Sequence, residues 1–336
     1  MIDLAIAGVQ HGHFMYFLDS VAGRDDARIV GFSETDPAKR ETVAAETGLT
    51  PYESHQALLE ATKPTVVGVA AAFGDRGQIV LDALAAGAHV VADKPLCTTM
   101  EQLDAIEQAV TGTDQQLSVM FEKRGYGPSV KVRELVDEGR LGQLTLLHAT
   151  GPHKLNRPTR PDWFWQPESY GGILNDLVVH DIDMYLWLTG TQSGTVSGRA
   201  GNFAQLDKPG FEDAGLATVH GDGVDGAPRA MASLEVHWMS PAAAPWHGDY
   251  RIRITGTEGT AELNWRTGEL FLATHTTEPE LIECAPNIPA ATYFLDAISQ
   301  GVEPSVSTAD SILATRVSLL AQQSAANGGE LLTWHR

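Results

Sequence analysis

Short apolar runs alternate with helical stretches through residues 1–121, and this alternation is the feature that most constrains how the chain folds. The apolar runs lie at residues 2–7, 28–32, 65–70, 89–92 and 117–121. Segments rich in the helix formers Ala, Glu, Gln and Leu lie at residues 37–47, 54–61, 76–86 and 99–110. Strands that alternate with helices build a parallel sheet that helices cover on both faces. Residues 1–121 are therefore predicted to form a doubly wound α/β domain.

The pattern changes beyond residue 121. Helical patterns occur at residues 128–139, 172–188, 290–299 and 308–326. Between residues 195 and 284, short strand-like runs follow one another across Gly, Pro and Asp turns without an intervening helix. Strands connected in this way favour antiparallel pairing. Residues 122–336 are therefore predicted to form a second α/β domain with a large, open, mostly antiparallel sheet.

Composition excludes several classes of partner and setting. The chain has 23 Lys and Arg against 43 Asp and Glu, a formal net charge of −20. Because nucleic acid binds basic surfaces, this balance argues against a nucleic-acid partner. No apolar run approaches the roughly 20 residues of a membrane span, and the start of the chain lacks the basic and apolar pattern of a signal peptide. Cys97 and Cys284 are the only cysteines, so a cytoplasmic setting is expected.

The segment Gly8-Val9-Gln10-His11-Gly12-His13 follows the first apolar run, where a dinucleotide-binding fold holds the cofactor pyrophosphate. Counted from Gly8, the other glycine positions of the G-x-G-x-x-G pattern hold Gln10 and His13. An ordinary strand-to-helix turn therefore stays an alternative. On the cofactor interpretation, the residues that bind NAD here are Gly8, Gln10, His11, Gly12 and His13.

Glu34 follows the second apolar run, near the position of the acidic residue that binds the adenosine ribose in such folds. A carboxylate there accepts hydrogen bonds from the ribose hydroxyls and repels a 2′-phosphate. No Arg immediately follows Glu34, so NAD is favoured over NADP. The alternative is that Asp36 caps the next helix and Glu34 is merely solvated.

Asp93-Lys94-Pro95 lies at the C-terminal end of the apolar run 89–92. Ligands of open α/β sheets bind outside the carboxyl ends of the strands. An ammonium group there can hydrogen-bond a substrate hydroxyl and stabilise developing alkoxide charge. The alternative is a surface Lys that precedes a helix.

Asp176, His180 and Asp183 share one face of the helix predicted over residues 172–188. Imidazole exchanges protons near neutral pH, and a carboxylate one turn away can orient it. A solvated polar face is the alternative, but the flanking residues are strongly apolar. A metal site that uses His148, His153 and His180 lacks compact ligand spacing, so no metal is expected.

Four segments together resemble the Gfo/Idh/MocA family, the relatives of glucose–fructose oxidoreductase and inositol dehydrogenase. Asp93-Lys94-Pro95-Leu96 is similar to the family's Glu-Lys-Pro motif, and residues 171–183 resemble its Gly-Gly stretch followed by Asp-x-x-x-His. Residues 254–260 resemble its Gly-Thr-x-Gly turn, and residues 294–304 its C-terminal helix region. The resemblance implies a Rossmann domain followed by an α/β domain with an open sheet.

The resemblance also implies a nicotinamide cofactor, a sugar or polyol substrate, and a catalytic group of Lys94, Asp176 and His180. Expected substrate contacts, besides that group, are Lys123, Arg124 and Trp163. Several positions depart from the family pattern. Ala71, Ala72 and Arg76 stand where the family often has Thr, Pro and His, Asp93 replaces Glu, and the glycine loop is degenerate. Ala71 and Asp93, together with Lys94, are still expected to contact the cofactor.

The sequence thus predicts an NAD-dependent oxidoreductase that interconverts a secondary hydroxyl and a carbonyl on a sugar, an inositol-like polyol or a related small molecule. His180 is the expected base, Lys94 polarises the oxygen, and Asp176 orients His180 or binds substrate. Two other functions stay open. One is an NAD-using enzyme that cleaves or eliminates glycosides, and the other is a non-catalytic regulator that binds NAD or a ligand. By resemblance, a homodimer or homotetramer through the second-domain sheet is expected, with no membrane partner.

Overall fold

The computed structural model describes residues 1–223 and 228–336, and the chain divides into two compact units. The first unit comprises residues 1–121, 168–171 and 289–312, and the second comprises residues 122–167, 172–288 and 313–336. The units therefore differ from two continuous domains that meet after residue 121. The reason is hydrophobic: Phe294 and Leu295, on helix α9 (Thr292–Gln300), are buried in the same core as Phe17 and Ile6.

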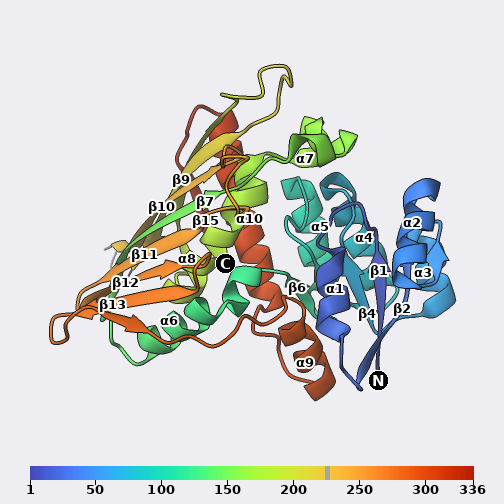
Figure 1. The fold of residues 1–336 in the computed structure, drawn as a ribbon, viewed down its shortest axis with the longest axis horizontal. Coiled ribbons are helices and arrows are strands. Elements are labelled where there is room, and N and C mark those ends of the chain that lie inside the picture. The colour runs from blue at the N-terminus through green and yellow to red at the C-terminus, as the bar shows by residue number, and fades with distance from the viewer. Residues whose placement is uncertain (224–227) are drawn as a thin grey trace. The chain divides into compact units, whose positions relative to one another are not determined.

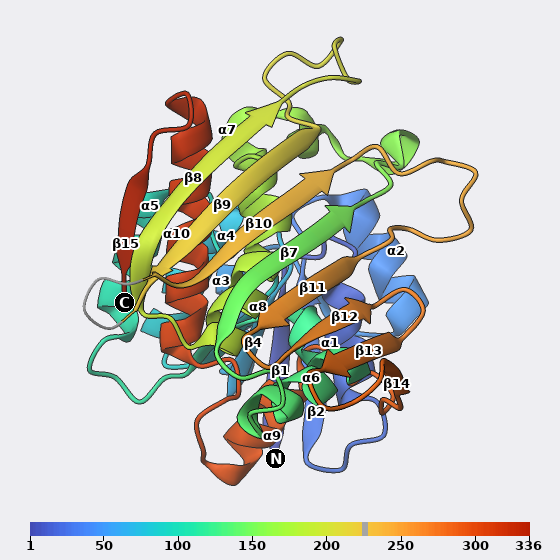
Figure 2. The same cartoon turned by 90° about the vertical axis from the view of Figure 1, so that its left-hand side faces the viewer.

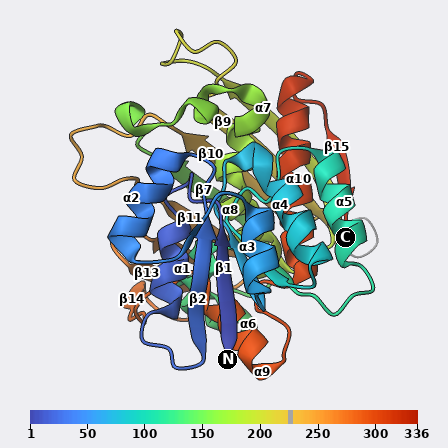
Figure 3. The same cartoon turned by 90° about the vertical axis from the view of Figure 1, so that its right-hand side faces the viewer.

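The first unit is built on a six-stranded sheet in the order β3-β2-β1-β4-β5-β6, with every pair parallel (Figures 1 and 3). The strands are β1 (Ile2–Ala7), β2 (Ala27–Ser33), β3 (Pro51–Tyr52), β4 (Val66–Val69), β5 (His89–Ala92) and β6 (Leu117–Val119). This is the strand order of dinucleotide-binding folds. The predicted doubly wound sheet is confirmed, and the two-residue strand β3 is an addition too short for a sequence pattern to reveal.

Helices connect these strands on both faces of the sheet, as Figure 3 shows. They are α1 (Phe14–Val21), α2 (Pro37–Thr47), α3 (His55–Thr62), α4 (Phe73–Ala85) and α5 (Met100–Val110). Helix α2 begins and ends at the predicted residues because both ends are capped. The Asp36 carboxylate accepts hydrogen bonds from the backbone N–H groups of Ala38 and Lys39, and Gly48 ends the helix in the left-handed conformation.

The core of the first unit lies between the sheet and its helices. Phe17 of α1 is fully buried against β4, where a Cβ atom added to Gly68 would lie 3.0 Å from the Phe17 ring. Glycine at this position lets the helix approach the strand closely. The approach fixes α1, and with it the loop between β1 and α1.

The second unit contains a nine-stranded sheet in the order β14-β13-β12-β11-β7-β10-β9-β8-β15 (Figure 2). The strands are β7 (Leu144–Pro152), β8 (Ser193–Gly201), β9 (Ala214–Asp222), β10 (Pro228–His237), β11 (Arg251–Gly256), β12 (Gly259–Asn264), β13 (Glu269–Thr274), β14 (Glu280–Ile282) and β15 (Leu332–His335). Strands β7 and β10 pair in parallel, and the other neighbours pair antiparallel. The predicted large, mostly antiparallel sheet is confirmed.

Helices pack against one face of this sheet, and the other face is seen in Figure 2. The helices of this unit are α6 (Gly127–Asp137), α8 (Val179–Thr189) and most of α10 (Thr308–Ala326), whereas the short helix α7 (Pro167–Tyr170) belongs mainly to the first unit. Helix α8 contacts β7 and β10, and α6 contacts β12 and β13. Buried and exposed residues alternate along β9, as expected for a strand with one covered face.

The regular helix predicted over residues 172–188 is interrupted. Residues Leu174–Val178 form a π-helical segment, and the α-helix proper begins at Val179. A π-turn holds more residues per turn than an α-turn, so the even angular spacing assumed for Asp176 and His180 is wrong. Within the described residues, no helix is both long and apolar enough to cross a bilayer.

Candidate active site

The loop between β1 and α1 approaches β4 very closely at Gly8. Gly8 has φ of +78°, and a Cβ atom added there would lie 2.5 Å from the Cβ atom of Ala71. Its N–H donates to the backbone and side-chain oxygens of Ser33, at 3.1 Å and 3.2 Å. These contacts hold the degenerate loop against the ends of β2 and β4, although Gly8 is its one glycine in the expected register.

The Glu34 carboxylate is buried, with 1% of the residue exposed, so the solvated alternative is wrong. Its Oε1 atom accepts hydrogen bonds from Gln10 Nε2 at 2.9 Å and from the Asp36 N–H at 3.0 Å. Its Oε2 atom has no hydrogen-bond partner among the described residues. A buried carboxylate oxygen that lacks a donor is costly, and the hydroxyl of a bound ribose would satisfy it.

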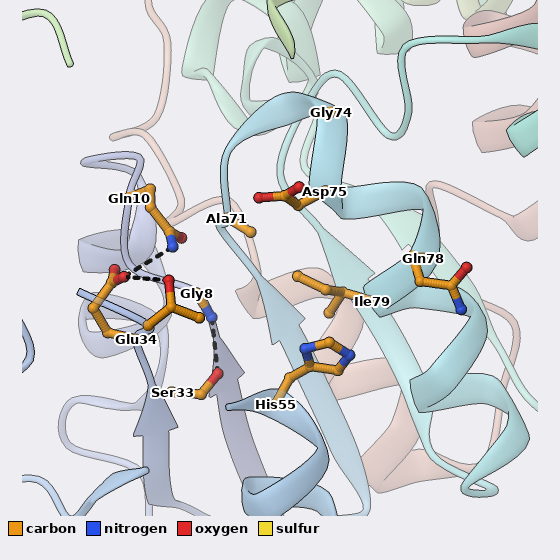
Figure 4. A pocket seen from close by; sticks show the side chains of 11 residues that line it. Gly8, Gln10, Ser33, Glu34, His55, Ala71, Gly74, Asp75, Gln78 and Ile79 are labelled. Atoms are coloured by element: carbon orange, nitrogen blue, oxygen red, sulfur yellow. Dashed lines mark hydrogen bonds between the residues drawn. The ribbon is translucent and has the colours of Figure 1, made fainter. Parts of the chain in front are cut away.

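Glu34 and Gln10 border a pocket at the carboxyl ends of β1, β2 and β4 (Figure 4). The residues that line it are Gly8, Gln10, Ser33, Glu34, Thr35, His55, Ala71, Gly74, Asp75, Gln78 and Ile79. In Figure 4, Gln10 and Glu34 lie on one side and Ile79 on the other. Four of these residues, Gly8, Gln10, Glu34 and Ala71, are ones that the sequence predicts to contact the cofactor. A carboxylate on one side and the Ile79 side chain on the other suit the polar ribose and the apolar base of a bound adenosine.

Two cations lie close to this carboxylate, although no Arg immediately follows it in the sequence. Lys39 Nζ donates to the backbone oxygen of Gln10 at 3.2 Å, and Arg40 Nη1 donates to the backbone oxygen of Glu34 at 2.7 Å. Burial lowers the pKa of Lys39, against the opposing effects of Glu34 and Asp36. An absence of cations therefore cannot be the basis of the expected preference for NAD over NADP, and the Glu34 charge stays the predicted basis.

Replacing Glu34 with glutamine should weaken NAD binding by about tenfold or more, because a hydrogen bond to a charged group contributes roughly 1.5–3 kcal/mol. The same change should strengthen NADP binding, since it removes the carboxylate charge that repels a 2′-phosphate. Calorimetric titration with both cofactors measures the two affinities. Glu41→Gln, an exposed change on the same helix, should leave both unchanged. Equal affinities for NAD and NADP in the unmodified protein would refute the role of Glu34.

Replacing Gly8 with alanine should destabilise the first unit by about 1–3 kcal/mol. The backbone at this position has a positive φ, which alanine adopts only with strain, and the new Cβ atom would overlap Ala71. NAD affinity should fall with it, since the loop must move away from β4. Gly12→Ala is the matched control in the same loop, because no atom lies within 4 Å of a Cβ atom there. Thermal unfolding and NAD titration of both variants test this. Identical behaviour of the two variants would show that the close approach is unimportant.

His11, His13 and Asp93 converge at the carboxyl end of β5, and we call these three residues the histidine cluster. The Nδ1 atoms of His11 and His13 lie 2.8 Å and 2.9 Å from the two Asp93 carboxylate oxygens. Arg76, buried in α4, donates to Asp93 Oδ2 at 2.7 Å. Burial, together with the smaller effect of His13, lowers the pKa of His11 to about 3 against the opposing effect of Asp93. Burial alone would raise the pKa of Asp93, but Arg76 and the histidines hold it well below its usual range.

Lys94 follows Asp93 at the same end of the sheet, and the Lys94–Pro95 peptide bond is cis. Its Nζ atom lies 5.9 Å from the centre of the Phe73 ring, over which the Arg76 guanidinium lies at 4.5 Å. Lys94 therefore lies at the carboxyl edge of the parallel sheet, as its position in the sequence predicts.

In the second unit, His180 lies in the first turn of α8, directly after the π-helical segment that carries Asp176. His180 Nε2 lies 3.4 Å from Oε1 of Glu122. Glu122 belongs to a 3-10 turn, Glu122–Gly125, and had no role in the sequence analysis because it is far from His180 along the chain. A carboxylate at this distance stabilises the protonated imidazole, which is what a general base requires.

Lys123 and Arg124, in that same turn, form buried ion pairs with two acids of α8. Lys123 Nζ lies 2.5 Å from Asp181 Oδ1, and Arg124 Nη2 lies 2.5 Å from Asp183 Oδ1. Burial raises the pKa of Asp181, against the opposing effect of Lys123. Asp183 thus binds Arg124, and both expected substrate contacts are engaged by the protein itself.

Trp163 lies in the short 3-10 helix Asp162–Trp165, within an aromatic cluster of the second unit. Its ring is 5.9 Å from that of Phe164, which packs against Phe211 at 5.4 Å and Trp238 at 5.6 Å. Phe164 is buried and anchors this irregular segment to the sheet. The anchoring explains how a segment without regular pattern becomes ordered.

The strand order, the Gly8 loop and the buried Glu34 together define a dinucleotide-binding domain. Two family descriptions match the chain: "Oxidoreductase family, NAD-binding Rossmann fold" over residues 2–121 and "GFO/IDH/MocA C-terminal domain" over residues 129–262. The chain belongs to the Gfo/Idh/MocA family, and it is an NAD-binding oxidoreductase.

Curated proteins and solved structures agree with this family. Inositol 2-dehydrogenase of Rhizobium meliloti (strain 1021) is 26% identical over 316 residues, which span 91% of this chain and 92% of that protein. An oxidoreductase structure from Thermotoga maritima is 26% identical, covers 99% of this chain and 100% of its own, and has a TM-score of 0.89. Levoglucosan dehydrogenase in complex with NADH is 20% identical, with 99% and 98% coverage and a TM-score of 0.83, which shows the shared fold.

Proposed function

We propose that the protein oxidises a secondary hydroxyl group of an inositol-like polyol or a sugar and transfers the hydride to NAD, or catalyses the reverse reaction. The observation that carries the proposal is the His180 imidazole beside the Glu122 carboxylate, 3.4 Å away, on the helix that follows Asp176. An alcohol that loses hydride must also lose a proton, and a neutral imidazole accepts it near pH 7. Relatives named for inositol and levoglucosan support the substrate class.

In this proposal the cofactor supplies the hydride acceptor, and the chain supplies everything else. Gly8, Gln10, Glu34 and Ala71 hold the cofactor in the pocket of the first unit. Lys94 donates a hydrogen bond to the reacting oxygen and stabilises its developing negative charge. His180 takes the hydroxyl proton, and Asp176 orients His180 or holds a second substrate hydroxyl. Trp163, Lys123 and Arg124 shape the substrate side, the last two through their ion pairs.

The experiment is a screen of inositols, levoglucosan and related sugars with NAD, followed at the NADH absorbance. Accumulation of NADH in proportion to the oxidised product supports the proposal. Release of a cleaved or dehydrated product without NADH accumulation would establish the glycoside-cleaving alternative instead. NAD binding without turnover of any polyol or sugar would favour the regulator.

We further propose that the uncovered face of the nine-stranded sheet forms a homodimer or homotetramer interface. Large apolar side chains on its strands are exposed, among them Leu146, Leu216, Met231 and Phe271. Leu146 and Met231 lie opposite each other on the paired strands β7 and β10. Light scattering measures the oligomeric state, and a monomer at micromolar concentration would contradict this interface. We also place the protein in the cytoplasm, since neither Cys97 nor Cys284 forms a disulfide.

A further inference from the structure

The histidine cluster has the composition and the compactness of a metal site. One ligand atom each from His11, His13 and Asp93 can be chosen so that all three lie within 4.8 Å of one another. The two imidazole rings are nearly perpendicular, with centroids 4.3 Å apart, and both present Nδ1 to the same carboxylate. We propose that the histidine cluster binds one divalent transition-metal ion of the kind that imidazole and carboxylate ligands hold, such as Zn²⁺ or Fe²⁺. The proposal does not depend on the substrate of the oxidoreductase.

Two imidazoles and one carboxylate are a ligand set that leaves coordination positions open for water or an oxygen ligand. The ion would bind the Nδ1 lone pairs of His11 and His13 and one carboxylate oxygen of Asp93. Without the ion, each Nδ1 atom carries a proton and donates it to an Asp93 oxygen. Metal binding at Nδ1 shifts that proton to Nε2 of the same ring, so a neutral imidazole releases no net proton. Side chains of His11 and His13 are 14% and 26% exposed, which leaves a path for the ion.

Arg76 fixes the carboxylate ligand and shapes the metal preference. Its guanidinium donates to Asp93 Oδ2 at 2.7 Å and to the backbone oxygens of Ala71 and Pro95 at 2.9 Å and 3.0 Å. Hydrogen bonds of this kind orient metal ligands. Because Arg76 compensates the single anionic ligand, Mg²⁺ and Ca²⁺, which need several oxygen ligands, are disfavoured. Metals that bind imidazole nitrogen strongly are favoured.

The cluster also gathers the positions at which the chain departs from the pattern of the family it resembles. His13 stands at a glycine position of the loop, Arg76 stands where the family often has His, and Asp93 stands where it has Glu. These three positions are far apart in the sequence, yet His13 and Arg76 both contact Asp93. Departures that form one connected network indicate a shared role, and a metal site is one that all of them serve.

The test is direct metal binding to the intact protein. After treatment with a chelator and dialysis, the protein is titrated with Zn²⁺ by calorimetry and with Co²⁺ by visible absorption. We expect about one ion per chain. Loss of a ligand should weaken binding by at least roughly tenfold, as even changes beyond the direct ligands do, so His11→Ala and His13→Ala should each show that loss. His275→Ala is the control, because His275 is an exposed residue of the second unit whose Nε2 atom lies 3.1 Å from the backbone oxygen of Thr257, and this variant should bind the metal normally.

The melting temperature is measured on the same variants, so that loss of the fold and loss of the metal are distinguished. If the alanine variants do not fold, X-ray absorption of the unmodified protein with bound Co²⁺ tests the site instead. The proposal requires that the spectrum show nitrogen ligands from two imidazoles. Substoichiometric binding by the unmodified protein overturns the proposal. Unchanged binding by both histidine variants, or a cobalt spectrum without imidazole ligands, overturns it equally.

Discussion

Replacing His180 with alanine is expected to lower kcat for the NAD-dependent oxidation by roughly 10²–10⁴-fold, the usual contribution of a positioned general base. NAD affinity should stay nearly unchanged, because the pocket that holds Glu34 is formed entirely by residues of the first unit. The variant should also lose the acid-limb pKa of the pH–rate profile. Below that pKa the protonated imidazole cannot accept the substrate proton, and without His180 no such limit exists. Steady-state kinetics from pH 5 to 9, with NAD titration, provide the measurements.

Neighbouring variants separate the roles. Lys94→Ala should be at least as damaging, since it removes the charge that stabilises the reacting oxygen. Asp176→Asn should be milder if Asp176 only orients the imidazole. His148→Ala is the control, because His148 is exposed on β7 and hydrogen-bonds Ser233. Wild-type turnover by the His180 variant would show that His180 is not the base, and Lys94 or a chain of water molecules would then be the candidate.

Replacing Lys123 with methionine is expected to destabilise the second unit by about 3–5 kcal/mol, the cost of leaving one member of a buried ion pair alone. Lys123 and Asp181 are both buried, and the Asp181 Oδ2 atom has no hydrogen-bond partner among the described residues. The loss should be larger at pH 8 than at pH 5. Burial raises the pKa of Asp181, so without Lys123 its folded-state pKa stays above the unfolded value. Stability is then retained at low pH and lost as the pH rises through that pKa.

Urea unfolding of three variants, followed by tryptophan fluorescence, measures this effect. Lys131→Met is the matched control, since Lys131 forms an exposed ion pair with Glu134 on α6 and such pairs contribute about 0–1 kcal/mol. The double variant Lys123→Met/Asp181→Leu should recover most of the loss, because it removes both buried charges. If Lys123→Met were no more destabilising than Lys131→Met, the pair would not be buried in solution.

The order of elements in the first unit could be predicted from local signals. Helix α2 has the predicted bounds because Asp36 and Gly48 cap it, and β5 has them because its apolar run is short and sharply bounded. The interruption at Leu174–Val178 could not be predicted, since a π-turn has no local sequence signal and depends on how the segment packs. The packing of α9 in the core of the first unit could not be predicted either, because it depends on which distant apolar residues bury Phe294 and Leu295.

The candidate site shows the same division. Glu34 could be found from its position after a strand, and His180 from its motif, because both depend on order along the chain. Glu122 beside His180, Asp181 beside Lys123, and Arg76 beside Asp93 could not be found in this way. Nothing in the sequence specifies which distant charges meet in a buried place.

The sequence by itself determined that this chain forms a parallel nucleotide-binding sheet followed by an antiparallel one, and which residues stand at the strand ends where ligands bind. Hydrophobic periodicity and helix caps involve residues that are close together in the chain, so the sequence alone reveals them. Only the tertiary structure decided that Glu34 is buried with an unsatisfied oxygen, and that His11 and His13 meet Asp93, 80 residues beyond His13. Burial and charge pairing depend on contacts between distant segments, and those contacts exist only once the sheet has brought its strand ends together.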